Sequence, residues 1–132
     1  MIPLVWWLRA VGLLYLIHFV AMVFARAPIR TLGPKDALAQ AAAGAPIARF
    51  LVDTWVIFGL ENLALGVALL IASGAPQRAV LLAWAVVGIE LTRGIVADLY
   101  MIARGNNRNA SLAWIAIHAA VIVTGVLALR SA

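Results

Sequence analysis

Two glutamates carry the strongest chemical signal in this chain, because each lies inside a long apolar stretch. Glu61 and Glu90 both end the same local pattern, W-x-x-x-G-[L/I]-E, which begins at Trp55 and again at Trp84. A carboxylate inside hydrocarbon is costly, so such a residue usually binds a proton, an ion or a ligand. The second occurrence of the pattern predicts a repeated structural unit with one carboxylate in each copy.

Four further polar residues interrupt the apolar stretches: Asp53, Arg93, His18 and His118. A rise of about 1.5 Å per residue places these four and Glu90 about 17–22 Å into a hydrocarbon layer about 30 Å thick, and Glu61 at about 10 Å. Arg93 follows Glu90 by three residues, a spacing that puts two side chains on one helix face. We expect Glu90, Arg93 and Asp53 to form one buried network, with both histidines facing the same interior.

These six residues are the candidates for ligand or proton binding, and no catalytic residue is assigned. Each histidine fits either a plain hydrogen bond to a neighbour or a proton relay with Glu90, since carboxylate–histidine chains recur in transporters. Haem or metal ligation is disfavoured because the Glu-x-x-His pair of di-iron bundles is absent, so no metal site is predicted. Asp98, close to Arg104 at a helix end, is interpreted as an interfacial anchor.

Composition shows what must position these groups. Of the 132 residues, 66% are hydrophobic and only 11% charged, whereas soluble domains carry about 25% charged residues. Four segments have the length of about 20 apolar residues that a membrane-spanning helix needs: 3–25, 47–72, 78–103 and 110–129. The first is expected to be a retained helix rather than a cleaved signal peptide. The sequence predicts a single domain over residues 1–132, an all-α integral membrane four-helix up-down bundle.

The connections carry most of the cations. Residues 26–46 contain three prolines and two glycines, and the alanine-rich stretch 35–43 between them predicts a short interfacial helix. Gly105 and Asn109 are expected to end the third helix and open the fourth. Six Lys/Arg residues follow the first and third helices, against three on the opposite side, which predicts a bacterial inner-membrane protein with both termini outside the cytoplasm.

Two side-chain patterns predict how the helices meet lipid and one another. All five tryptophans fall within the first turns of their helices, which is typical of an interfacial aromatic belt. Small residues recur every four positions in the last helix, at Ala116, Ala120, Thr124 and Ala128, and such a ridge predicts a helix-packing face.

The stretch from Val52 to Glu61 and the stretch from Gly88 to Tyr100 resemble the BphX-like family, whose architecture is also similar to that of the DoxX-like group. The resemblance implies a small four-helix membrane protein of the kind found beside aromatic-degradation operons. It implies no catalytic residue, cofactor or substrate.

Three functions fit these observations. The leading hypothesis is a protein whose polar centre binds a hydrophobic or weakly acidic small molecule, with proton coupling. The alternatives are an accessory subunit that packs against a larger membrane complex or against itself, and a membrane-embedded isomerase or quinone- or haem-linked oxidoreductase. The expected partners are therefore the lipid bilayer, a small molecule and a membrane protein. Nucleic acid is excluded, because the net charge of +5 includes no basic run.

Overall fold

The computed structural model describes residues 2–132, and in this range it contains helices and no strand. Four helical segments are long and apolar enough to cross a membrane: α1 (Leu4–Val23), α4 (Pro46–Ala72), the segment Val80–Ala103 and α7 (Arg108–Leu129). The predicted all-α class with four membrane-length helices is confirmed, and the protein is a multi-pass membrane protein. The observed ends lie within two residues of the expected ones.

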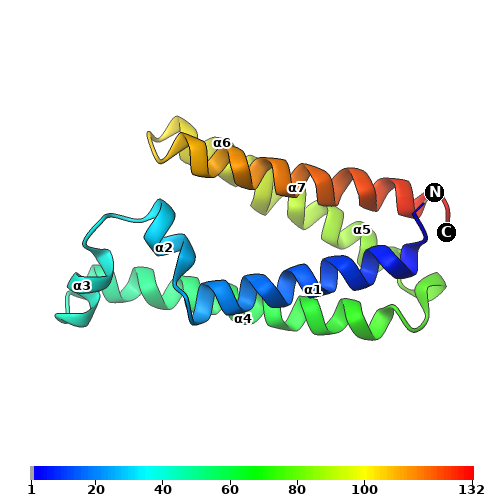
Figure 1. Ribbon diagram of the computed structural model, residues 1–132, viewed down its shortest axis with the longest axis horizontal. Coiled ribbons are helices and arrows are strands. Elements are labelled where there is room, and N and C mark those ends of the chain that lie inside the picture. The colour runs from blue at the N-terminus through cyan, green and yellow to red at the C-terminus, as the bar shows by residue number, and fades with distance from the viewer. Residues whose placement is uncertain (1) are drawn as a thin grey trace. The chain divides into compact units, whose positions relative to one another are not determined.

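The third span changes helical type along its length. It consists of α5 (Val80–Ile89), the π-helix η2 (Glu90–Val96) and α6 (Ala97–Ala103), which follow one another without a break (Figure 1). A π-helix bonds each N–H five residues back, and such turns inside α-helices are frequent at functional sites. Nothing in the sequence pattern predicted this segment. It begins at Glu90, one of the two glutamates of the repeated pattern.

The connections contain more structure than expected. The short helix predicted within residues 35–43 is α3 (Ala37–Ala42), while α2 (Ala27–Leu32) and η1 (Pro76–Arg78) were not predicted. Gly44 and Gly105 follow helix ends with φ of 95° and 82°, a backbone conformation that glycine adopts without strain. The expected cap of the last helix is wrong by two residues, because Asn107 rather than Asn109 accepts the Ala110 N–H, at 3.3 Å.

The chain forms two compact units, a first unit of residues 1–12 and 68–132 and a second unit of residues 13–67. In the first unit α7 runs beside α5, η2 and α6 (Figure 1). In the second unit Gly59 of α4 packs against the Met22 and Val23 side chains of α1. There Asn62 Nδ2 donates to Phe58 O at 3.0 Å and lies 3.2 Å from Met22 Sδ.

Trp7 corrects part of the aromatic-belt interpretation. Its side chain lies in the core of the first unit with 3% of its surface exposed, and its Nε1–H donates to Val121 O at 3.2 Å. Its ring lies so close to Gly125 that a Cβ there would sit 2.7 Å from a ring carbon. Its position near a helix start had suggested a place at the membrane surface. Its buried environment shows instead that Trp7 fixes α1 to α7.

The predicted packing ridge on α7 is buried only at its end, at Ala128. Ala116 and Ala120 are exposed, whereas the buried residues of α7 are Ser111, Val121, Gly125 and Ala128. The large Trp7 indole needs the space beside Gly125, so the buried face includes this glycine and leaves out Ala116 and Ala120.

Candidate functional site

The polar cluster in the first unit is built around His118, whose two ring nitrogens each face a carboxylate. Nδ1 lies 2.5 Å from Glu90 Oε2, so the two groups are in close hydrogen-bond contact. Nε2 lies 3.7 Å from Asp98 Oδ2, a distance too long for a direct hydrogen bond but within ion-pair range. The carboxylates come from η2 and α6 on one span and the histidine comes from α7.

Gly94 allows the imidazole to approach the third span. A Cβ at this position would lie within 3 Å of three atoms of the His118 ring. Since real Cβ atoms do not approach other atoms so closely, a glycine is required for the ring to rest against the backbone of η2. The π-helix therefore contributes two features to the site: the buried Glu90 at its start and the open backbone at Gly94.

The cluster is shielded from the surroundings of the protein. Glu90 is 7% exposed, and the exposed fractions of the His118 and Asp98 side chains are 19% and 13%. Ser111, two turns before His118 on α7, is completely buried. Its Oγ interacts with Asp98 without reaching hydrogen-bond geometry. The polar groups thus continue from Glu90 to the end of the span where α6 meets α7.

The number of protons on these three side chains decides whether they attract or repel one another. A neutral imidazole carries one N–H, so with two ionised carboxylates one ring nitrogen would point its lone pair at a negative oxygen. An added proton removes this repulsion, either as an imidazolium that faces both carboxylates or as one protonated carboxyl group. In either case one added proton removes the repulsion within all three side chains.

The remaining predicted site residues are Arg93 in the first unit and Asp53, Glu61 and His18 in the second unit. Arg93 is exposed on η2, although Glu90 three residues earlier is buried. Asp53 and Glu61 are exposed on α4, and His18 is half-buried on α1, all three in the second unit. Within the first unit the structure brings Glu90 and His118 together. The network of Glu90 with Arg93 and Asp53, and the shared interior of the two histidines, stay predictions.

Three residues of the cluster were not predicted as site residues. Asp98 was interpreted as an anchor, but its half-buried carboxylate faces His118. Its spacing of eight residues from Glu90, about two helical turns, was a usable signal, as was the spacing of seven between Ser111 and His118. Gly94 inside a helical stretch was a weaker sign of close packing.

No group of three or more His, Asp or Glu side chains is arranged to hold a metal ion anywhere in residues 2–132. The cluster consists of two carboxylates on the two sides of one imidazole.

The comparison with protein families agrees with this architecture. A family model described as BphX-like matches residues 1–132, the whole chain. The chain belongs to the BphX-like family. The resemblance noted for residues 52–61 and 88–100 is confirmed, and the match extends over the whole chain. No curated protein and no solved structure matches this BphX-like protein, so the roles of its residues rest on the geometry of the site.

Proposed function

We propose that this BphX-like protein is a membrane protein whose Glu90–His118–Asp98 cluster reversibly binds a proton and couples that proton to a hydrophobic, weakly acidic ligand. One observation carries the proposal: a carboxylate faces each ring nitrogen of His118. An imidazole held in this way can accept a proton at Nε2 and release one from Nδ1, which is the chemistry of a relay.

The order of the groups supports access from one end of the span. Asp98 lies five residues before the end of α6 and Ser111 lies in the first turn of α7, whereas Glu90 lies farther into the span. Beyond Glu90 the buried side chains of α5 and α7 are apolar, namely Ala83, Val86, Val87, Val121 and Ala128. We propose that protons enter from the connection between α6 and α7 and stop at Glu90.

The cation count predicts which side of the membrane this end of the span faces. We propose that the connections 26–46 and 104–109 face the bacterial cytoplasm and both termini face outward, so that the relay opens to the cytoplasm. A reporter that is active only outside the cytoplasm should give signal when it is fused to the C-terminus. Silence there, with signal from a fusion within residues 26–46, would reverse the orientation and the side of access.

The proton site is tested on protein labelled with ¹⁵N-histidine, in which His18→Gln leaves His118 as the only imidazole. Its two nitrogen resonances report where the proton lies, and we expect them to change together as the pH is varied over the range in which the protein stays folded. Glu90→Gln should alter the Nδ1 signal most and Asp98→Asn the Nε2 signal. A ring that keeps one protonation state over this range would overturn reversible proton binding.

The ligand is tested with benzoate, an apolar weak acid. We expect its addition to shift both nitrogen resonances and to change the number of bound protons, measured as a pH change in weakly buffered detergent solution. The Glu90→Gln variant should show neither effect. If benzoate binds equally well to the variant, the ligand site is independent of the cluster.

An accessory role is the second candidate, and the exposed alanine ridge of α7 favours it. Ala116 and Ala120 present small side chains that allow another helix to approach closely in lipid. Ala120→Leu should then disrupt a homo-oligomer or a complex on native gels, while Ala85→Leu, at an exposed alanine on α5, should not. Unchanged assembly in both variants would leave the proton site as the function.

A further inference from the structure

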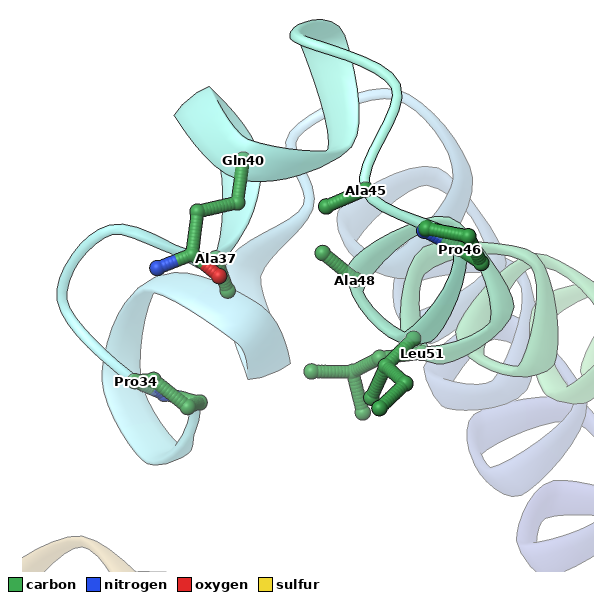
Figure 2. Close-up of a pocket in the computed structure, with 8 residues that line it drawn as sticks. Pro34, Ala37, Gln40, Ala45, Pro46, Ala48 and Leu51 are labelled. Carbon is green, nitrogen blue, oxygen red and sulfur yellow. The ribbon is translucent and has the colours of Figure 1, made fainter.

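The second unit contains a hollow at the membrane boundary that the proton site does not use. It has a volume of about 310 Å³, at the lower end of the range of ligand pockets. Its walls are formed by the α2–α3 connection, α3 and the first turns of α4. Figure 2 shows Ala37 and Gln40 on one side, and Ala45, Ala48 and Leu51 on the other. Gln40 is the only polar side chain in a lining that is otherwise apolar.

The hollow lies where two spans reach the same membrane surface. Within the second unit α1 ends at Val23 and α4 begins at Pro46, so the residues between them follow the boundary of the bilayer. Large apolar side chains are exposed at this level: Ile47 is 87% exposed, and Phe24 and Phe50 are similarly open. Surroundings of this kind suit the upper part of a lipid acyl chain better than water.

The charges near the hollow are mainly positive. Residues 26–49 contain four cations, Arg26, Arg30, Lys35 and Arg49, against the single acid Asp36. Lys35 follows the lining residue Pro34, and Arg49 follows the lining residue Ala48. The Arg49 guanidinium turns toward the end of α3, where Nε donates to Ala41 O at 3.3 Å.

Arg26, at the start of the same connection, has a buried guanidinium nitrogen. Its Nη1 is buried without a hydrogen-bond acceptor among the described residues. Its backbone has φ of 52°, in the left-handed region that a non-glycine residue rarely adopts. A buried guanidinium nitrogen costs stability unless an acceptor is supplied, and a phosphate oxygen is a fitting one.

We infer that this hollow is a binding site for an anionic phospholipid. One acyl chain would lie along the apolar lining, and the phosphate would meet Lys35 and Arg49 at the rim. Basic pockets at the membrane surface bind anionic head groups because the local field attracts them. Phosphatidylcholine, with the same chains and no net charge, should bind much less well. The site lies wholly in the second unit, so it does not depend on the proposed proton function.

The test compares lipids with identical acyl chains. Purified protein in detergent is incubated with equal amounts of phosphatidylglycerol and phosphatidylcholine, and the bound lipid is measured by native mass spectrometry. We expect preferential retention of phosphatidylglycerol. Lys35→Gln with Arg49→Gln should lower that retention by about 30-fold, which corresponds to about 1 kcal/mol for each cation. Glutamine at position 49 still carries an N–H donor for the Ala41 carbonyl.

Two controls separate the hollow from general surface charge. Arg104→Gln with Arg108→Gln removes two exposed cations from the other connection, which is predicted to face the same side, and should retain the lipid. Ala45→Leu, which fills the hollow, should weaken retention with all cations in place, whereas Ala43→Leu on the exposed surface should not. Circular dichroism verifies that each variant keeps its helices.

Three results would overturn the inference. Equal retention of the two lipids by the wild-type protein would remove the need for an anionic head group. An equal loss in the Arg104/Arg108 variant would indicate non-specific charge attraction. Full displacement of phosphatidylglycerol by free glycerol phosphate would indicate a site for a small soluble anion instead of a lipid.

Discussion

The two copies of the W-x-x-x-G-[L/I]-E pattern have opposite environments. In the copy on α4, Gly59 is buried against α1 and Glu61 is exposed. In the copy on α5 and η2, Gly88 has no neighbouring atom within 4 Å of an added Cβ, and Glu90 is buried against His118. The glycine is the buried residue in one copy, and the glutamate is the buried residue in the other.

This contrast shows that the pattern marks a shared helical segment without determining which face is packed. The second copy turns its glutamate inward where α5 passes into the π-helix η2, and Gly94 opens the backbone to the histidine. The first copy lies in an uninterrupted α-helix. We infer that the change of helical type, rather than the sequence pattern, turns the Glu90 side chain toward His118.

The largest expected difference between the copies is at the glutamates. Glu90→Gln should reduce the free energy of unfolding by about 2–3 kcal/mol, because a buried charge-assisted hydrogen bond to His118 is lost. Glu61→Gln should reduce it less, because Glu61 is exposed whereas Glu90 is buried. Unfolding by increasing mole fractions of a denaturing detergent measures both. Equal losses would mean that the two carboxylates are held alike.

Gly94 provides the next test, since its effect acts through the same histidine. Gly94→Ala places a methyl group against the His118 ring and should cost about 1–3 kcal/mol, as overpacking typically does. The ¹⁵N resonances of His118 should move at the same time, because the ring must shift away from η2. Unchanged resonances in the variant would show that the ring is not confined by Gly94.

Substitutions of the two glycines should have smaller effects on stability, and here the first copy should be the more sensitive one. Gly59→Ala should be destabilising by about 1 kcal/mol or more, because the new Cβ meets Val23 and Met22. Gly88→Ala meets open space and should be neutral or stabilising by up to about 1 kcal/mol through better helix propensity. Thermal unfolding in detergent compares the two. A loss at position 88 as large as that at 59 would contradict the described packing.

The weakest expected effect concerns Arg93, the cation predicted to join Glu90 in a network. Arg93→Met should be partly compensated by Glu90→Gln, with a coupling energy of about 0.5 kcal/mol or more in a double-mutant cycle. Arg93 is exposed, so the coupling should be smaller than that of a fully buried pair. Strict additivity of the two changes would remove Arg93 from the network.

Much of the helical plan could be predicted from the sequence for a direct physical reason. Each span needs about 20 apolar residues, and glycine or proline marks most of the connections, so the four segments are visible in composition alone. Family membership was also visible, because the motif-bearing stretches of the second and third helices resembled the BphX-like pattern that matches the whole chain. Glu90 and His118 stood out as costly polar groups in apolar stretches.

The partners of those groups depended on tertiary structure. The sequence determined that Glu90 and His118 lie within spans, because hydropathy and length are local properties. It did not determine that Asp98 completes the cluster, that Trp7 packs beside Gly125, or that the chain turns into a π-helix at Glu90. Side-chain contacts between helices depend on how each helix is rotated and how closely the two helices approach. A π-helix lengthens the hydrogen-bond spacing by one residue and thereby alters both.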